Sequence, residues 1–268
     1  MVPLLPLLHV GASLSASSFT VHWSTVVGLA VLAVLYEIGG RRGDLTGRRL
    51  YFYAALATIF FSLNGWLHDL SDWYLFSAHM VQHLVLTLVV PPLLLTGLPG
   101  WMIDALLGPV LARPAGAAVA RAATRPLPAF AVYAVAIVAW HLPGPYNTAL
   151  EHHGWHVVEH LILLVAATLG WWPILSPSRL APALPYAGQL LYLFVFGIPM
   201  TVVAAMITAA ERVLYPFYEA APRLFDLTPL ADQRLGGVLM WVPSGFIPLA
   251  AFTIVFFRWV AAEVDEAA

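Results

Sequence analysis

Residues 75–98 read LFSAHMVQHLVLTLVVPPLLLTGL, a run without any aspartate, glutamate, lysine or arginine. A helix needs about 20 mainly apolar residues to cross the hydrocarbon core of a bilayer, so this stretch predicts a membrane-spanning helix. The whole chain has the same character, with 61% hydrophobic and 10% charged residues and a mean hydropathy of +0.83. Soluble domains carry roughly 25% charged residues. The sequence therefore predicts an integral membrane protein whose surroundings are lipid, and no nucleic-acid partner is expected.

Seven apolar runs of this kind predict a seven-transmembrane helix bundle, in a single integral-membrane domain that covers residues 1–268. The runs are continuously apolar and lack the alternation that the strands of a membrane barrel show, so the predicted fold class is all-α. The predicted spans are 20–38, 50–68, 75–98, 126–142, 155–175, 187–210 and 236–259.

The arginines predict the orientation of the bundle, because basic residues in short loops are retained on the cytoplasmic side. Lysine is absent, so all twelve basic residues are arginines. Three of them fall in one connection, between the sixth and seventh spans. The other nine fall in the alternate connections or after the last span: Arg41, Arg42, Arg48, Arg49, Arg113, Arg121, Arg125, Arg179 and Arg258. This distribution predicts the N-terminus outside and the C-terminus in the cytoplasm.

Prolines within three of the predicted spans predict kinks, because proline lacks the N–H that a helix interior needs. They are Pro91 and Pro92 in the third span, Pro199 in the sixth, and Pro243 and Pro248 in the seventh. The connection 101–123 combines apolar residues with spaced arginines, a pattern typical of a helix that lies in the membrane interface.

Two histidine pairs share one spacing, HMVQH at 79–83 and HVVEH at 156–160. Residues four apart lie on one face of a helix. Both pairs begin near the start of a span, where the helix dipole favours neutral rings that can bind a metal. On the predicted topology all ten histidines lie on the outer side. Since ionisable groups inside a span are costly and mark functional sites, we predict a metal site at His79, His83, His156 and His160 that faces outward.

Further donors extend the predicted ligand set. His68 and His141 close the second and fourth spans, and Met240 is expected in the outer half of the seventh, where a thioether can bind a soft ion. Gln82 and Glu159 precede the second histidine of each pair and are expected to orient a ligating ring. For Glu159 the roles of ligand and general base stay open. Because the chain has no cysteine, histidine with methionine favours copper over zinc. Asp72 is expected to be a solvated acid in a loop.

These motifs resemble those of the multi-spanning CtaG-type cytochrome c oxidase assembly factors, and the resemblance covers most of the chain. It rests on FSAHMVQH at 76–83, PPLLLTGLP at 91–99, WHLPGPY at 140–146, HVVEH at 156–160, WWP at 171–173, LYP at 214–216 and LADQRLGGVLMW at 230–241.

The resemblance implies a role in maturing a haem-copper oxidase in a bacterial plasma membrane, by supplying or holding copper on the outer side. The implied recipient is a subunit of cytochrome c oxidase. The family's motifs fall on the two histidine pairs and on Met80, Gln82, His141, Glu159, Asp232, Gln233, Met240 and Trp241. Asp232 and Gln233 are thereby expected to support the ligands from a second layer. His68, His152 and His153 fall outside these motifs. Whether a monomer or a homo-oligomer acts is left open.

Two other functions compete with a metallochaperone that has no catalytic residues. HxxEH is also the spacing of some zinc peptidases, so a zinc-dependent membrane hydrolase with Glu159 as the base is one alternative. Facing histidines can also bind haem axially, and a single haem near the outer surface is the second alternative.

Overall fold

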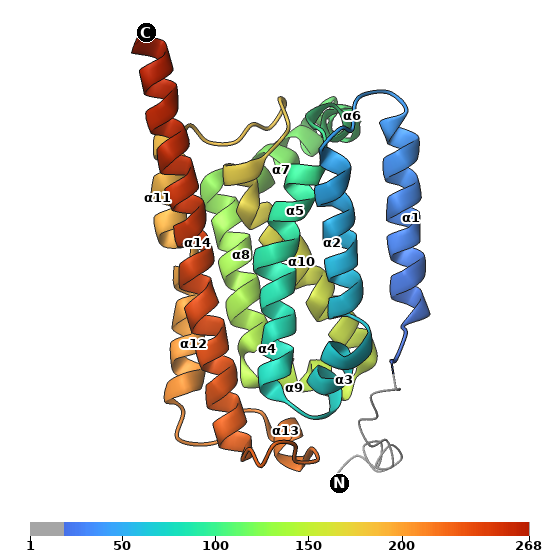
Figure 1. Ribbon diagram of the computed structural model, residues 1–268, viewed down its shortest axis with the longest axis vertical. Helices are drawn as coiled ribbons and strands as arrows, with labels where there is room; N and C mark the ends of the chain where they lie inside the picture. Colours follow the sequence, from blue (N-terminus) through green and yellow to red (C-terminus); the bar gives the residue numbers. More distant parts are fainter. Residues whose placement is uncertain (1–18, 268) are drawn as a thin grey trace.

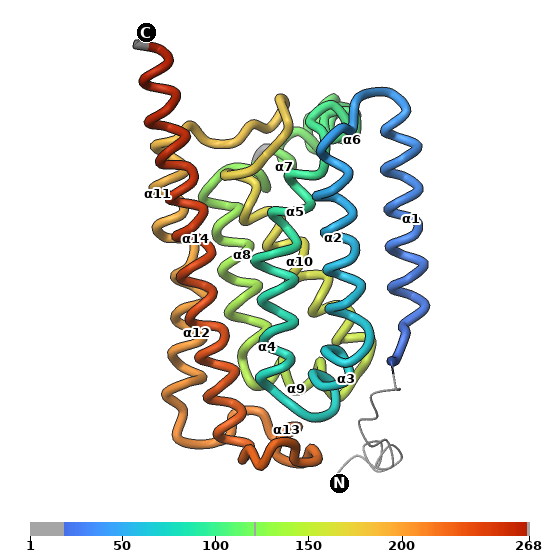
Figure 2. Tube along the Cα trace, viewed as in Figure 1, coloured from blue at the N-terminus to red at the C-terminus, as the bar shows by residue number. Residues whose placement is uncertain are grey.

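The computed structural model describes residues 19–267, and every regular element in this part of the chain is a helix (Figures 1 and 2). This confirms the predicted all-α class. One of the ten histidines, His9, lies outside the described residues. The elements are α1 (Trp23–Gly40), α2 (Arg48–Ser62), α3 (Gly65–Trp73), α4 (Phe76–Leu84), the π-helix η2 (Val85–Val89), α5 (Val90–Gly97), α6 (Gly100–Leu111), α7 (Pro114–Thr124), α8 (Pro126–His141), α9 (Pro143–Glu151), α10 (His153–Leu175), α11 (Tyr186–Phe196), α12 (Ile198–Ala209), α13 (Pro216–Ala220) and α14 (Pro229–Ala267).

The long helices run side by side along the longest axis of the molecule (Figure 1). α10 packs on α8 and α5, α14 packs on α12 and α4, and α2 packs on α5. The short helices α3, α9 and α13 gather at the lower end of the view, whereas α6 and α7 lie at the upper end. The helix termini that carry the described histidines are at the lower end, and most of the arginines are at the upper end. The two ends of the bundle are therefore chemically distinct.

Five helices or continuous helix pairs are long and apolar enough to cross a membrane, and two bent pairs raise the number to seven if each is one span. One bent pair is α2 with α3, at 43°, and the other is α7 with α8, at 70°. Both coincide with predicted spans that the structure shortens: α2 ends at Ser62, and α8 has 16 residues. The number of crossings is thus five to seven, and the orientation of the termini remains a prediction.

Residues 101–123, expected as one interfacial helix, form two helices instead. The break falls at Arg113, whose backbone is extended with φ −99° and ψ 129°. Proline disfavours helical geometry in the residue before it, and Pro114 follows this position. The seventh helix is longer than its predicted span of 236–259. It has 39 residues as α14 and includes both Pro243 and Pro248.

The third predicted span is one continuous helix from α4 to α5. Its prolines coincide with a change of helix type and do not break the helix. Pro91 has no N–H to offer the carbonyl of Thr87, one turn earlier. The Trp171 indole donates to that carbonyl instead, at 3.0 Å. The π-helical turn lies directly before the prolines, where helices commonly absorb such an irregularity. In the sixth span, Pro199 follows the break between α11 and α12 at Gly197.

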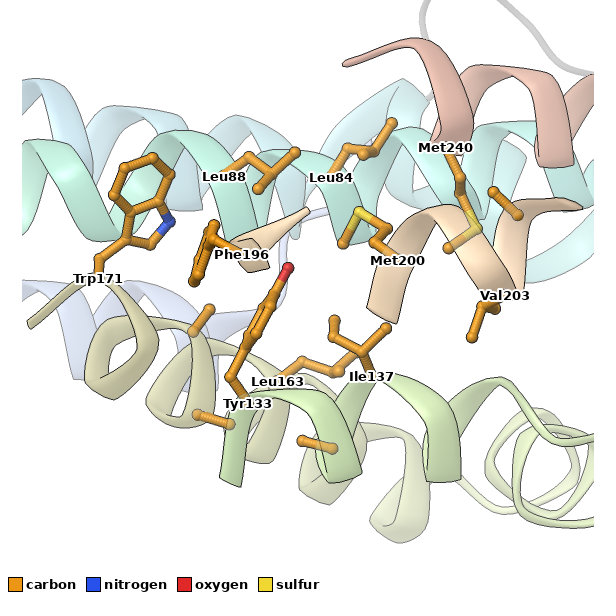
Figure 3. Packing of buried hydrophobic residues seen from close by; sticks show 14 of the residues in the cluster. Leu84, Leu88, Tyr133, Ile137, Leu163, Trp171, Phe196, Met200, Val203 and Met240 are labelled. Atoms are coloured by element: carbon orange, nitrogen blue, oxygen red, sulfur yellow. The ribbon is translucent and has the colours of Figure 1, made fainter. Parts of the chain in front are cut away.

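The apolar core fills the middle of the bundle and extends around the histidine pairs, since Phe76 and Met80 belong to the same buried cluster. Tyr133 stacks on Phe196 with ring centroids 4.5 Å apart, and Trp171 packs against the same ring (Figure 3). Leu84 and Leu163 follow the last histidines of α4 and α10 and belong to the same buried cluster. The core thus closes the histidine-bearing end of the bundle from one side.

Candidate metal centre

The two HxxxH turns lie on α4 and α10 and face one another inside the bundle. His79, His83, Glu159 and His160 each offer one ligand atom, and these atoms lie within 4.8 Å of one another. All four side chains are buried, with Glu159 and His79 fully so. Two segments about eighty residues apart in sequence therefore form one compact group of nitrogen and oxygen donors.

The spacing of the donors fits a first-row metal ion. The Nε2 atoms of His79 and His160 are 3.4 Å apart. Two nitrogens bound to one tetrahedral ion at 2.0–2.1 Å would be separated by about 3.3 Å. The nearest oxygen of Glu159 lies 3.7 Å from His83 Nε2. These two separations are thus close to the one that a shared ion requires.

The ring of His79 is fixed by Tyr218 of the short helix α13. The Tyr218 hydroxyl donates to the carbonyl of Ser71 at 2.6 Å and lies 2.9 Å from His79 Nδ1. Burial raises the pKa of Tyr218 well above its ordinary value, so the phenol stays protonated. Because its only hydrogen goes to Ser71, it accepts from Nδ1–H of His79. The neutral ring then carries a free lone pair on Nε2, the atom that faces His160.

The ring of His83 is fixed in the same way by His141 at the end of α8. His141 Nδ1 lies 2.7 Å from the carbonyl of Ile137, which can only accept, so its Nε2 is unprotonated in the neutral ring. That Nε2 lies 3.3 Å from His83 Nδ1 and accepts from it. The lone pair of His83 is therefore on Nε2, toward Glu159. In this geometry His141 orients His83, where the sequence predicts a ligand.

Four ligand atoms at this place have no hydrogen-bond partner among the described residues, although they are buried. They are His83 Nε2, His156 Nε2 and both carboxylate oxygens of Glu159. Buried polar groups are nearly always paired, and an unpaired carboxylate is the costliest of them. A cation bound here would pair with His83 Nε2 and with the Glu159 carboxyl, so the donor set fits a metal ion.

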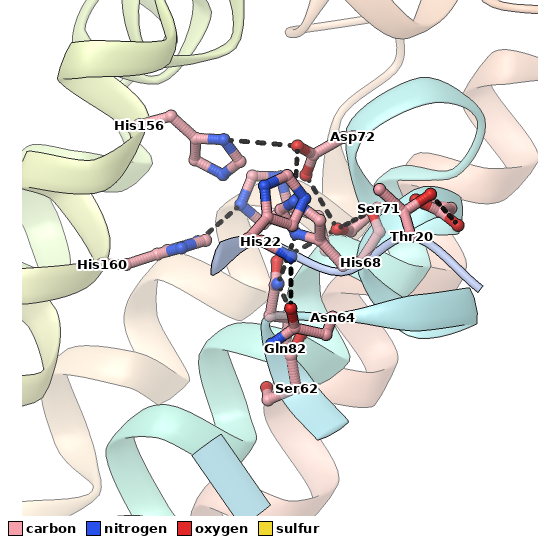
Figure 4. Close-up of polar contacts among 12 residues, drawn as sticks. Thr20, His22, Ser62, Asn64, His68, Ser71, Asp72, Gln82, His156 and His160 are labelled. Carbon is pink, nitrogen blue, oxygen red and sulfur yellow. Dashed lines mark hydrogen bonds and ion pairs between the residues drawn. The ribbon is translucent and has the colours of Figure 1, made fainter. Parts of the chain in front are cut away.

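Gln82 holds a different histidine from the one expected. Its amide nitrogen donates to the carbonyl of Ser62 at 2.7 Å and lies 3.2 Å from His68 Nδ1, which accepts the second hydrogen (Figure 4). Its side chain points toward α2 and α3 rather than toward His83, so the ring that it contacts is His68, and its role in orienting a metal ligand stays a prediction. His68 itself lies outside the four-residue group, beside Asp72.

The remaining predicted residues support the elements rather than the ring atoms. Asp232 of α14 is fully buried and accepts from the backbone N–H groups of Phe76 and Ser77, at 2.7 and 3.2 Å, so it caps the start of α4. Gln233 accepts from the N–H of Leu214 at 2.6 Å and fixes the loop that leads into α13. Each therefore acts on a helix or loop that carries a site residue.

Met240 is buried in the apolar cluster, close to Met200 and Val203 (Figure 3). The structure thus gives this thioether an apolar setting, and its role as a ligand stays a prediction. His156 lies next to the group, with its ring 4.3 Å from that of His160 between centroids.

The sequence did not identify two residues that contact histidines of this region. Tyr218 has no motif around it, and its contact with His79 spans 139 residues of the chain. Asp72 was expected as a solvated loop acid, but its side chain is only 15% exposed and lies 3.3 Å from His68 Nε2. Its position four residues after His68 is the same helical spacing as in the two pairs, and that signal could have identified it.

A family comparison covers this part of the chain. The family model of the cytochrome c oxidase caa3 assembly factor (Caa3_CtaG) matches residues 29–262. The chain belongs to this family. The resemblance inferred from the motifs is thereby confirmed, and the caa3 assembly factor match includes α4, α10, α13 and the capping residues of α14.

Two mycobacterial proteins are similar to the chain in sequence. The uncharacterized protein Mb0105 of Mycobacterium bovis and the uncharacterized protein MT0111 of Mycobacterium tuberculosis are each 26% identical to the chain over 247 residues. The alignments cover 82% of this caa3 assembly factor homologue but 36% of each relative, so the chain spans about a third of their length. No solved structure matches the chain.

Proposed function

We propose that this protein binds a copper ion at His79, His83, Glu159 and His160 and delivers it to a cytochrome c oxidase subunit during assembly of the enzyme. The site would face the outer side of a bacterial plasma membrane, in keeping with the predicted topology. Family membership supports a role in oxidase assembly. The ion is cargo in this proposal, and no residue of the chain acts as a catalyst.

The observation that carries the proposal is the group of unpaired, buried ligand atoms. Three imidazoles and one carboxylate converge within 4.8 Å, and Glu159 has no hydrogen-bond partner among the described residues. A helix bundle that needed only stability would replace such a group with apolar side chains. Imidazole suits copper as well as zinc, and copper heads the affinity series of the divalent ions.

The geometry favours a bare ion over the two alternatives. A haem takes two axial ligands and needs the plane between them clear for the porphyrin, whereas four ligand atoms here lie within 4.8 Å of one another, which weighs against haem. A zinc hydrolase needs Glu159 free to act on a bound water beside a substrate. This carboxylate is fully buried and is itself a member of the donor group, so it supports binding better than hydrolysis.

The test is copper stoichiometry on the full chain, purified in a mild detergent and loaded with Cu²⁺. We expect one tightly held copper per chain in the wild type, and a loss of about a hundredfold in affinity when His83 and His160 are both changed to Ala. Elemental analysis and competition against a chelator of known affinity measure the two quantities. His152→Ala is the matched control, because His152 is exposed at the same end of the bundle.

Oxidase assembly provides the second readout. The double variant should leave the recipient oxidase short of copper in cells that depend on this protein, whereas His152→Ala should not. Full oxidase assembly by a chain that never holds copper would remove the proposal. Hydrolysis of a lipid amide, with zinc bound and activity lost in Glu159→Gln, would favour the enzyme instead.

A further inference from the structure

A series of histidine rings connects the surface to the buried group. His153 is exposed, His22 is partly exposed, and His68 and His156 are buried. Between ring centroids, His22 lies 6.4 Å from His153 and 4.4 Å from His68, and His68 lies 6.2 Å from His156. The last step, from His156 to His79, is 5.1 Å. The rings thus form a graded path from solvent into the bundle.

Asp72 lies between two of these rings. Its Oδ2 is 3.3 Å from His68 Nε2 and 3.6 Å from His156 Nδ1 (Figure 4). Ser71 contributes a hydroxyl 3.0 Å from the other carboxylate oxygen. A carboxylate flanked by two imidazole nitrogens is a ligand set for a borderline metal ion. These atoms belong to a separate location from the group of His79, His83, Glu159 and His160.

His156 belongs to both locations. Its Nδ1 faces Asp72, while its Nε2 is buried and has no hydrogen-bond partner in the described part of the chain. On the inner side its ring contacts those of His79 and His160. The His156 ring therefore borders both locations. A neutral imidazole has one free lone pair, so His156 binds an ion from one side at a time, and the ring proton moves between Nδ1 and Nε2 as the ion passes.

The outer location is held in place by a docked segment of backbone. His22 donates its N–H to Asn64 Oδ1 at 2.6 Å, and Gly65 donates to the carbonyl of Thr20 at 2.8 Å. Gly65 has φ +68°, and a Cβ at this position would collide with the ring of Phe19, so only glycine permits this close approach. The bend between α2 and α3 thereby holds His22 over His68.

We propose that His22, His68, Asp72 and His156 form an outer site that captures a transition-metal ion and passes it to the buried group, with His156 as the shared ligand. The inference rests on the proposed function, because it assigns the loading route of the same cargo. In the metal-free chain His68 carries its proton on Nε2, since Gln82 donates to its Nδ1. Binding of an ion at Nε2 requires this proton to move to Nδ1, which then no longer accepts from Gln82. The negative charge of Asp72 attracts the cation from solvent, and the series of rings gives it successive ligands.

The experiment measures how fast the full chain acquires copper that a chelator cannot remove. Metal-free protein in detergent is mixed with Cu²⁺, quenched with excess chelator at increasing times, and assayed for retained copper. We expect the double variant His68→Gln, Asp72→Asn to reach the wild-type stoichiometry about tenfold more slowly, because removing an attracting charge lowers the rate of ion capture. His83→Ala should lack the chelator-resistant copper at all times but keep a rapidly exchanging fraction.

Two further variants make the result specific. His22→Gln leaves the backbone anchor to Asn64 intact, so it tests the route without disturbing the fold, and we expect loading to slow about threefold. His152→Gln is the matched control, as an exposed histidine of the same rim outside the ring series, and it should load at the wild-type rate. Wild-type loading rates in both the double variant and His22→Gln would overturn the outer site and leave the proposed function standing. A wild-type chain without chelator-resistant copper would overturn both.

Discussion

The two HxxxH turns have the same spacing but very different support. On α4, His79 Nδ1 is held by Tyr218 and His83 Nδ1 by His141, and the helix start is capped by Asp232. On α10, His156 Nδ1 lies 3.6 Å from the nearest carboxylate, too far for a hydrogen bond. The start of α10 has no side-chain cap. One turn is therefore a fixed half of the site, and the other is less constrained.

The difference extends to the residue before the second histidine. Gln82 occupies this place on α4 and is fully hydrogen-bonded, to Ser62, Ser71 and His68. Glu159 occupies it on α10, and in the described structure neither of its oxygens has a partner. The same position thus serves architecture in one turn and ligand chemistry in the other. A fixed half that sets the geometry and a less constrained half that adds a carboxyl ligand make a consistent division for a protein that is proposed to release its cargo.

The largest expected effect comes from exchanging these two chemistries. Gln82→Glu places a carboxylate oxygen against the Ser62 carbonyl and buries a charge, so we expect a loss of about 3 kcal/mol in the stability of the metal-free chain. Glu159→Gln replaces a buried carboxyl that has no hydrogen-bond partner among the described residues, so it should leave that stability unchanged or raised, while copper affinity falls about tenfold or more. Thermal unfolding of metal-free protein in detergent compares the two. A loss of stability in both variants would contradict the division between the turns.

The sequence was sufficient to predict which turns come together. Apolar runs separated by arginine-bearing loops predict helices, and two HxxxH spacings at the same end of two helices predict that their rings can share one depth. Breaks within the spans were less accessible, because the bends at Asn64 and Arg113 depend on local backbone geometry. The support of the rings was beyond reach, since the Asp232 cap joins residues 156 positions apart and depends on how α14 packs against α4. Met240 stays a predicted ligand, because helical spacing alone does not tell an apolar contact from a ligand.

The capping difference between the helices gives a smaller effect. Asp232→Ala leaves two buried N–H groups at the start of α4 without an acceptor, so we expect a loss of about 2 kcal/mol in the free energy of unfolding. His152→Ala at the start of α10 removes no side-chain cap and should change it by less than about 0.5 kcal/mol. Unfolding by a denaturing detergent, followed through the helical circular dichroism signal, measures both. Equal losses in the two variants would show that α4 does not depend on its cap.

The smallest effect should come from Tyr218, which controls the protonated nitrogen of His79 without contacting the ion. In Tyr218→Phe the Nδ1–H loses its acceptor, and the ring can carry its proton on Nε2 instead, the atom that must stay free for a metal. We expect copper affinity to fall about tenfold, which corresponds to ~1.4 kcal/mol, in a competition titration with a chromophoric chelator. Tyr215→Phe is the matched control, because it also removes a buried hydroxyl, one that donates to the backbone carbonyl of His141 at 2.8 Å rather than to a ring. If Tyr215→Phe weakens copper binding as much as Tyr218→Phe does, general loosening of the α13 region explains the loss, and the tautomer of His79 does not.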